Sequence, residues 1–254
     1  MKTILITGAT SGIGKACALI FAKNNAKLIL TGRRTKKLNQ LQAQLEKKYK
    51  TKARILTFDV RDEKAVKTQL TSLPKAWKNI DLLINNAGLA KGFGPIHEGD
   101  INAWEIMIDT NIKGLLYMTR HVTPWMVKAK KGQIINVASI AGKQVYPNGN
   151  VYCASKHAVD ALTKAMRIDL HKYGIRVGQV APGHTEATEF ALVRYEGDKE
   201  KSKIYQDFTP INSKDVAEIV FFMSSQPKHV NIQDILVMGT QQANCYLIDR
   251  SGRK

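Results

Sequence analysis

Apolar, strand-like runs alternate with helical patterns along the whole chain of 254 residues. Several of the runs are continuously apolar, which is typical of strands that helices cover on both faces. Strands that are joined through helices run parallel, so the alternation predicts an α/β fold with a doubly wound sheet and helices on both faces. About seven parallel strands are expected, at residues 3–8, 27–32, 54–60, 82–85, 133–138, 175–181 and 235–238.

Capping residues mark where the helices between these strands should begin and end. One helix is expected over residues 12–24, with Asn25 as its C-cap. Thr35 and Asp62 are expected to cap the next two helices, and the second of these should end before Pro74. Further helices are expected over 100–121 with a second piece after Pro124, over 150–173 before Gly174, and from a Ser213 cap to 225.

One domain is expected to span residues 1–254, because this length is ordinary for a single α/β domain and 44% of the residues are hydrophobic. The segment 184–210 has no expected strand and is too long for an ordinary connection, so we expect it to cover a substrate. No apolar run approaches the ~20 residues that span a membrane, and the first residues lack the pattern of a signal peptide. These observations predict a cytoplasmic protein that does not bind membranes.

The formal net charge is +18, which raises the question of a nucleic-acid partner. The lysines look scattered along the sequence, without one dense stripe and without interleaved aromatic residues. We therefore interpret them as a solvated surface that attracts anionic small molecules at most, and we expect no nucleic-acid partner. The three cysteines form no CxxC pair, so no zinc site, no other metal site and no disulfide framework are predicted.

A glycine-rich segment, TGATSGIG at 7–14, follows the first expected strand and opens the first helix. Gly8 suits a tight turn, Gly12 lets the backbone approach a pyrophosphate, and Gly14 lets the helix pack closely on the strand. The helix N-terminus offers free N–H groups to phosphates, so the segment predicts a Rossmann-type dinucleotide site; the alternative is a turn that binds nothing. The residues expected to contact the cofactor there are Gly8, Thr10, Ser11, Gly12, Ile13 and Gly14.

The end of the second expected strand indicates which dinucleotide is used. Sheets that prefer NAD place an acidic residue there to hold the ribose 2′-hydroxyl, whereas this chain has Arg33 and Arg34. Guanidinium groups suit a 2′-phosphate, so the pair predicts NADP; the alternative is two ordinary surface cations. Asp59 and Val60 end the third expected strand and are predicted to meet the adenine edge.

Tyr152 and Lys156 lie four residues apart, so they share one face of the predicted helix. A free tyrosine has a pKa of about 10, and a nearby ammonium group lowers this pKa by favouring the phenolate. Lowering the pKa by about three units requires roughly 4 kcal/mol, which is possible in a dry site. The pair therefore suits a general acid and base, although a core tyrosine and a surface lysine would have the same spacing.

Short motifs occur in order along the chain: TGATSGIG, NNAG, the asparagine of NIKG, the serine of NVAS, YCASK, and the Pro-Gly that follows Ala181. With these motifs the chain resembles the short-chain dehydrogenase/reductase family, from residue 1 to about 238. The resemblance implies a catalytic tetrad of Ser139, Tyr152, Lys156 and Asn111. It also implies further cofactor contacts by Asn86, Ala87, Gly88, Tyr152, Lys156, Pro182 and Gly183.

Such a tetrad implies hydride transfer to or from a nicotinamide. Tyr152, as a phenolate, would take the proton of a hydroxyl group, and Lys156 would lower the tyrosine pKa and hold the nicotinamide ribose. Ser139 would donate a hydrogen bond to the developing carbonyl oxygen, and Asn111 would hold a water that relays the proton. The family also implies a homotetramer, whose interfaces could bury apolar pieces around 104–117 and 221–223.

Longer strings narrow the resemblance to the NADP-dependent 3-hydroxy acid dehydrogenases, the group that includes serine 3-dehydrogenase. These strings are LPKAWKNIDLLINNAGLAKG, WEIMIDTNIKGLLYMTR, the segment from TEF to VRYEGD, and HVNIQDILVM. The implied substrate is a small 3-hydroxy acid, serine-like or 3-hydroxypropanoate-like, or its keto or semialdehyde form. Two departures lie near the substrate side: Ala181 replaces an expected acid, and the run over 184–187 is unusual.

Arg194 is, with Ser139, the candidate substrate residue, because it lies in the substrate-covering segment and its fork suits a carboxylate. It could instead tie that segment to Glu189, Glu196 or a neighbouring subunit. Two other functions stay open: reduction of another carbonyl, such as a 3-oxoacyl thioester, a sugar or a steroid, and a catalytically inactive NADP(H)-binding sensor or scaffold. A nucleic-acid binder rests on the net charge alone.

Overall fold

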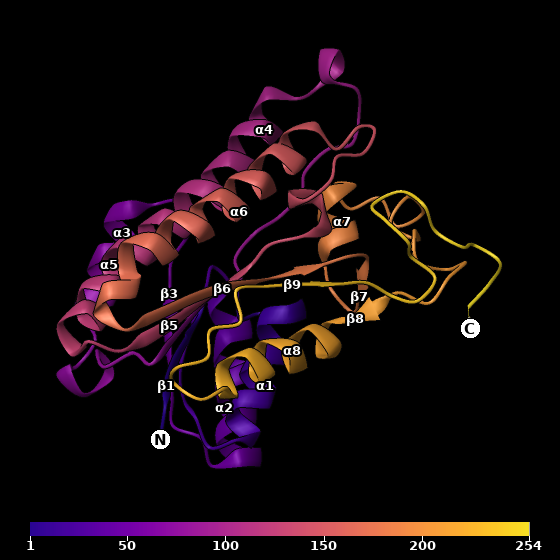
Figure 1. Cartoon of the computed structure of the whole chain (residues 1–254). Coiled ribbons are helices and arrows are strands. Elements are labelled where there is room, and N and C mark those ends of the chain that lie inside the picture. Colours follow the sequence, from indigo (N-terminus) through magenta and orange to yellow (C-terminus); the bar gives the residue numbers. More distant parts are fainter. Residues whose placement is uncertain (254) are drawn as a thin grey trace.

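A seven-stranded parallel sheet runs through the centre of the molecule, and helices cover both of its faces (Figure 1). The computed structural model describes residues 1–253. The strand order is β3-β2-β1-β4-β5-β6-β9, so the chain winds outward in one direction from β1 and then in the other from β4. The predicted Rossmann-type fold is confirmed. The strands are β1 Thr3–Ile6, β2 Lys27–Gly32, β3 Ala53–Thr57, β4 Leu82–Asn85, β5 Gly132–Val137, β6 Ile175–Pro182 and β9 Asp234–Val237.

The strands feed two hydrophobic cores, one on each face of the sheet. On β1, Ile4 and Ile6 belong to one core and Leu5 to the other, and all three side chains are fully buried. This two-sided burial explains why the strands read as continuous apolar runs. Helices α1 Gly12–Lys23, α2 Thr35–Tyr49 and α8 Ser213–Ser225 cover the first face, and α3 Glu63–Thr71, α4 Ile101–Ile108, α5 Gly114–Ala129 and α6 Asn150–Leu170 cover the second.

The predicted break at Pro124 is wrong, because this residue lies inside α5. Pro124 is exposed, so its ring faces solvent rather than the core. The long helix is instead interrupted earlier, by one π-helical turn at Asp109–Lys113 that separates α4 from α5. Such turns are frequent at functional sites, and this one holds Asn111 buried beneath the pocket described below.

Several helix caps differ by one residue from the prediction. Asn24 is the C-cap of α1, and Asn25 follows it in the left-handed region with φ 57°. The N-caps of α2 and α8 are Arg34 and Asn212 rather than the residues that follow them. Asp62 is confirmed as a cap, because its carboxylate accepts a hydrogen bond from the backbone N–H of Ala65. Cap position follows backbone dihedrals as well as side-chain type, so a cap is hard to place to the residue.

The sequence predicted no strand in the segment 184–210, but this segment does contain regular structure. It contains the short strand β7 Thr185–Glu186, which pairs with β8 Ile211–Asn212, and the one-turn helix α7 Phe190–Arg194. The C-terminal residues lie against this segment on the right of Figure 1. Arg250 pairs with Asp207 at 2.6 Å, and Arg253 pairs with Glu186 at 2.9 Å. The chain end therefore helps to hold the segment in place.

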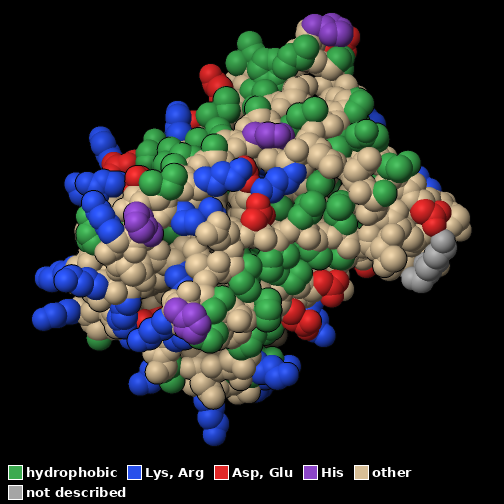
Figure 2. All heavy atoms as spheres, viewed as in Figure 1, with side chains coloured by type: hydrophobic (Ala, Val, Ile, Leu, Met, Phe, Trp, Pro, Cys, Tyr) green, Lys and Arg blue, Asp and Glu red, His purple; other side chains and the backbone are tan. Residues whose placement is uncertain are grey.

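Some of the cations that are scattered along the sequence come together in the folded molecule, and two of them flank an aromatic ring. The amino ends of parallel strands all lie on the same side of the molecule. Cations of the loops that precede the strands meet on this side, which we call the amino edge of the sheet and which is on the left of Figure 2. Lys27 and Arg54 flank the Trp77 ring, at 4.0 and 5.3 Å from its centre. This edge lies opposite the pocket, so its charge does not surround the pocket mouth. The absence of a nucleic-acid partner stays a prediction. Within residues 1–253, no helix is long and apolar enough to cross a membrane.

A charged cluster ties α6 to the sheet and should make the protein sensitive to acid. Burial raises the pKa of Asp160, but hydrogen bonds from Lys143, Lys164 and Gln179 outweigh it and lower the pKa to about 2. The carboxylate is 13% exposed. A folded pKa below the unfolded value means that the stabilisation is present above the unfolded pKa and is lost as pH falls from about 4 towards 2.

Asp160→Asn should therefore lower the free energy of unfolding by about 2 kcal/mol at pH 7. It should also flatten the loss of stability between pH 4 and pH 2. Urea titrations over this pH range measure both effects. Asp169→Asn is the matched control, because Asp169 is exposed on the same helix. If the two variants lose stability equally, the cluster does not carry the effect.

Candidate active site

A cavity of about 640 Å³ opens at the carboxyl ends of the strands. Ligands of doubly wound sheets bind in this position, where the strand order reverses. The cavity brings together residues from both halves of the chain and includes nearly all predicted site residues. Those that line it are Gly8, Thr10, Ser11, Gly12, Ile13, Arg33, Arg34, Asp59, Val60, Asn86, Ala87, Gly88, Ser139, Tyr152, Lys156, Pro182, Gly183 and Arg194; the exceptions are Gly14 and Asn111.

The glycine-rich turn is closely packed and leaves its backbone open to the cavity. Gly8 and Gly12 have φ values of 65° and 51°, a region that favours glycine. A Cβ atom on Gly14 would lie 2.4 Å from the carbonyl oxygen of Gly8 and 2.5 Å from Asn86 Nδ2. Gly14 therefore permits helix and strand to pack, as expected, without lining the cavity. These glycines form a cradle of the kind that holds a pyrophosphate.

Arg34 ties the glycine-rich turn to the adenosine side of the cavity. Its Nη2 donates to Thr10 Oγ1 at 2.6 Å and to Ser11 Oγ at 3.0 Å, and its Nη1 pairs with Glu189 at 2.7 Å. Arg33 is 61% exposed and lies 3.6 Å from the Asp59 carboxylate. Both arginines line the cavity, as expected for residues that read a 2′-phosphate.

Lys37 is a third cation beside this end of the cavity, although it does not line the cavity, and no motif marks it. It pairs with the second oxygen of Glu189 at 2.8 Å. The signal for it was its position, one turn into α2 after the two arginines.

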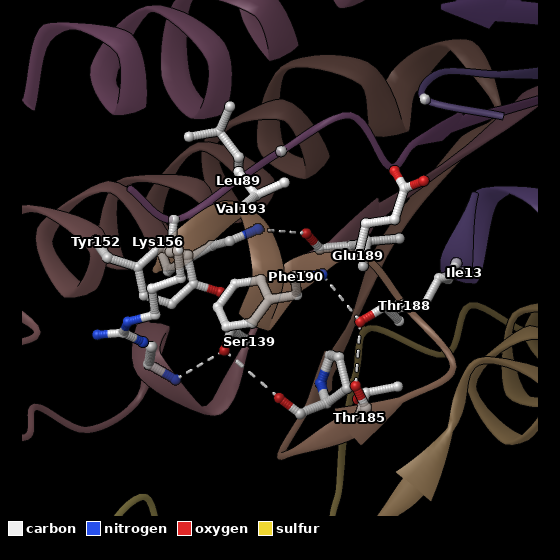
Figure 3. A pocket seen from close by; sticks show the side chains of 18 of the residues that line it. Ile13, Leu89, Ser139, Tyr152, Lys156, Thr185, Thr188, Glu189, Phe190 and Val193 are labelled. Carbon is white, nitrogen blue, oxygen red and sulfur yellow. Dashed lines mark hydrogen bonds between the residues drawn. The ribbon is translucent and has the colours of Figure 1, made fainter. Parts of the chain in front are cut away.

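Tyr152 and Lys156 lie on one face of α6, and both are buried, at 8% and 7% exposure. Ser139 lies two residues after β5 and is the N-cap of a 3₁₀ turn, where its hydroxyl accepts a hydrogen bond from the Ala141 N–H at 3.1 Å. Figure 3 shows Tyr152, Ser139 and Lys156 gathered on one side of the pocket, with Phe190 facing the tyrosine ring. The structure thus assembles three of the four residues that the motifs implied.

The expectation that the pKa of Tyr152 is lowered is not met by the protein's own groups. Burial raises this pKa to about 12, because desolvation disfavours the phenolate more than a hydrogen bond with Ser139 and the charge of Arg194 favour it. Lys156 Nζ lies 6.0 Å from the centre of the tyrosine ring and donates to the carbonyl oxygen of Val137 at 3.0 Å. Burial lowers the pKa of Lys156 to about 8.

Asn111 lies behind the cavity wall at 2% exposure. Its Nδ2 donates to the Leu89 carbonyl at 2.8 Å and to Ser155 Oγ at 2.9 Å, and its Oδ1 accepts from the Leu89 N–H at 2.9 Å. A Cβ atom on Gly88 would lie 3.2 Å from Oδ1 and 3.4 Å from Lys156 Nζ. Asn111 thus positions the loop after β4 next to Lys156, and both of its donor hydrogens are used.

Arg194 is a buried cation inside an aromatic cage, at 7% exposure. Its guanidinium lies 4.6 Å from the centre of the Phe93 ring and 5.7 Å from that of Tyr152, and it donates to the hydroxyl of Tyr146 at 2.7 Å. Its Nε has no hydrogen-bond partner among residues 1–253.

The carboxylates considered as alternative partners of Arg194 are engaged elsewhere. Glu189 pairs with Arg34 and Lys37, and Glu196 pairs with Lys91 at 3.3 Å. An intramolecular ion pair with either is therefore not the role of Arg194. What remains is a buried guanidinium that lines the cavity beside Tyr152 and that forms no salt bridge among residues 1–253.

Several residues of the substrate side were not found from the sequence. Tyr146 and Phe190 line the cavity beside Tyr152, but no motif marks either. His184, by contrast, belongs to the unusual run at 184–187 that the sequence marks; it lines the cavity half-buried, and burial lowers its pKa, so its ring is neutral at pH 7. The C-terminal residues Cys245, Tyr246, Ile248 and Arg250 also line the cavity, beyond the stretch that the motifs covered.

No metal site is present among residues 1–253, since no group of three or more His, Cys, Asp or Glu side chains is arranged to hold a metal ion.

Comparison with known proteins agrees with this geometry. The description "short chain dehydrogenase" belongs to the family model that matches residues 2–198. An NADP-dependent 3-hydroxy acid dehydrogenase of Salmonella typhi is 43% identical over 241 residues, which cover 94% of this chain and 96% of that protein. Sulfoacetaldehyde reductase 2 of Chromohalobacter salexigens is 45% identical over 250 residues, 97% and 98% of the two chains. The closed form of a serine dehydrogenase complexed with NADP+ has a TM-score of 0.93 at 43% identity and covers 96% and 98%.

Proposed function

The chain belongs to the short-chain dehydrogenase family, and we propose that it transfers hydride between NADP(H) and a small 3-hydroxy acid or the corresponding keto acid or semialdehyde. The observation that carries the proposal is the buried Arg194 beside Tyr152, a cation in the wall of the cavity that forms no salt bridge among residues 1–253. An acid/base tyrosine with an anion site next to it suits a substrate that has a hydroxyl or carbonyl near a carboxylate.

The residues of the cavity fit NADP. The turn at Gly8 and Gly12 would hold the pyrophosphate, and Arg33, Arg34 and Lys37 would surround the 2′-phosphate, which three cations favour over a neutral hydroxyl. Relatives of this chain are NADP-dependent by name, which supports the same cofactor. When bound, the nicotinamide supplies or accepts the hydride.

The protein's own groups handle the proton. With a pKa of about 12, Tyr152 is protonated at neutral pH, which suits a proton donor to a carbonyl oxygen during reduction. Oxidation needs the phenolate, so in that direction the charge of Lys156 has to help to lower the tyrosine pKa. Ser139 would donate a hydrogen bond to the same substrate oxygen. Asn111 would act by placing the loop after β4, with only Oδ1 left to accept from a relay water.

A second substrate class is favoured by the same guanidinium. A sulfonate is an anion that a buried arginine also binds, and one relative is named a sulfoacetaldehyde reductase. Initial rates separate the candidate substrates. In the oxidation direction they are measured with NADP+ or NAD+ and 3-hydroxy acids, L-serine or neutral alcohols. In the reduction direction they are measured with NADPH and small aldehydes that carry a carboxylate, a sulfonate or no charge. Equal rates with charged and neutral substrates would contradict an anion site. Turnover of 3-oxoacyl thioesters, sugars or steroids would instead favour the alternative function, reduction of another carbonyl compound.

A homotetramer in the cytoplasm is the assembly that we propose for the enzyme. Ile108 and Leu116 are each 39% exposed along α4 and α5, and Phe222 on α8 is 54% exposed. Large apolar side chains on helix surfaces of this kind favour burial between subunits. Light scattering after size-exclusion chromatography measures the assembly, and a monomer would contradict it.

The double substitution Arg33→Ala, Arg34→Ala should lower kcat/KM for NADP+ at least ~10-fold more than for NAD+. This factor is the scale of one lost hydrogen bond between charged groups. Arg33→Ala alone is the cleaner variant, because Arg34 also donates hydrogen bonds to the glycine-rich turn, whereas the ionic partner of Arg33 is Asp59. Lys36→Ala controls for the loss of an exposed charge in the first turn of α2, just after the two arginines. Equal losses with both cofactors would show that the arginines do not read the 2′-phosphate.

A further inference from the structure

The Glu189 carboxylate reaches across the nucleotide side of the cavity and joins two cations from a distant part of the chain. Its Oε2 lies 2.7 Å from Arg34 Nη1, and its Oε1 lies 2.8 Å from Lys37 Nζ. Burial raises the pKa of Glu189, but Lys37, Arg34 and Ser11 outweigh it and lower the pKa to about 2. The carboxylate is therefore charged throughout the physiological range.

The same guanidinium is the one assigned above to the 2′-phosphate. Arg34 already donates its Nη2 and Nε hydrogens to Thr10 and Ser11, so Nη1 is the donor that faces an anion, and Glu189 uses it. Lys37 has no other ionic partner among residues 1–253. A phosphate and a carboxylate repel each other when they share two cations, so the two anions compete for this position.

Glu189 also begins the element that carries the substrate-side residues. It is the N-cap of α7, which contains Phe190 and Arg194. The Phe190 ring lies 5.5 Å from the Tyr152 ring, and Figure 3 shows Glu189 on the opposite side of Phe190, near Ile13. The helix has five residues, so Glu189 and Arg194 lie at the two ends of one short element, about 7.5 Å long at 1.5 Å per residue.

We propose that Glu189 is a specificity-determining residue that competes with the 2′-phosphate of NADP(H) for Arg34 and Lys37 and thereby couples the identity of the cofactor to the position of α7. This inference rests on the proposed function, because it assumes that the cations read a 2′-phosphate. A dinucleotide with this phosphate displaces the carboxylate and frees α7 to adjust around the substrate. A dinucleotide without it leaves Glu189 on Arg34 and α7 held in place.

The first test measures binding alone, with adenosine 2′,5′-bisphosphate and 5′-AMP as probes that carry no nicotinamide. Glu189→Gln should tighten binding of the bisphosphate by about 3- to 10-fold, the scale of two partly exposed ion pairs, and change the Kd of 5′-AMP by less than about 2-fold. Isothermal titration calorimetry gives both constants. Glu196→Gln is the matched control, because Glu196 lies in the same segment but pairs with Lys91; neither constant should change.

The second test measures the coupling to α7 by amide hydrogen exchange at residues 189–194. In the unsubstituted enzyme the bisphosphate should raise exchange there relative to 5′-AMP, whereas in Glu189→Gln exchange should be equally high with either probe. Weaker or unchanged bisphosphate binding in Glu189→Gln, or equal exchange with the two probes in the unsubstituted enzyme, overturns the inference. Equal binding of the two probes by the unsubstituted enzyme would contradict the proposed NADP specificity itself. Failure of the proposed function is therefore distinguishable from failure of the inference about Glu189.

Discussion

Tyr152→Phe should lower kcat at least ~100-fold, the usual scale for a lost general acid or base, while the Kd of NADP+ stays nearly unchanged. The substitution removes the hydroxyl that gives or takes the proton. The ring keeps its packing against Phe190 and beneath the Arg194 guanidinium, so the fold of the pocket is retained. Steady-state kinetics in both directions measure kcat, and quenching of protein fluorescence measures cofactor binding.

Tyr146→Phe is the matched control for this result. Tyr146 is also a tyrosine in the pocket wall whose pKa burial raises, and its hydroxyl accepts a hydrogen bond from Arg194. Losing that hydroxyl should weaken the hold on Arg194 and raise KM, with a much smaller change in kcat. A Tyr152→Phe enzyme that keeps most of its turnover would rule out the proposed proton step, as would a Tyr146→Phe enzyme that loses as much kcat.

Arg194→Met should raise KM for an anionic substrate by roughly 10- to 100-fold, since a hydrogen bond between charged groups contributes about 1.5–3 kcal/mol. Methionine keeps the apolar stem of the side chain but loses the guanidinium contacts with the Phe93 and Phe190 rings, so a neutral substrate is needed to separate lost packing from lost anion binding. A neutral aldehyde of similar size should show little change in KM, and kcat should fall much less than in Tyr152→Phe. Kinetics with a carboxylate, a sulfonate and a neutral aldehyde measure this selectivity.

Two further variants test whether the effect of Arg194 depends on its charge and on its position. Arg194→Lys keeps the charge but loses the planar fork, so its KM for the anion should fall between those of the original enzyme and Arg194→Met. Arg250→Met removes another cation that lines the cavity, one already paired with Asp207 at 2.6 Å, and should affect KM less. If charged and neutral substrates suffer alike in Arg194→Met, the residue supports the pocket rather than the anion.

Local patterns were sufficient to predict the sheet, the glycine-rich turn and the Tyr152–Lys156 face. A strand buried on both sides is continuously apolar, and a helix repeats every 3.6 residues, so both are encoded within a few neighbouring residues. Gly8 and Gly12 both adopt positive φ, as expected because glycine has no Cβ atom and reaches this region readily. The π turn at Asp109–Lys113 and the continuation of α5 through Pro124 had no such local signal, because packing against neighbouring helices decides them.

The electrostatics and the substrate side were decided only by the tertiary structure. The cage of Arg194 draws Phe93, Tyr146, Tyr152 and Phe190 from separate segments. The sequence by itself determined which groups can titrate and that two of them share a helix face. The pKa of Tyr152 rises instead of falling because burial outweighs its favourable partners, and Glu189 meets a cation 155 residues away in the chain. Burial and distance set these energies, and both exist only once segments remote in the sequence have packed together.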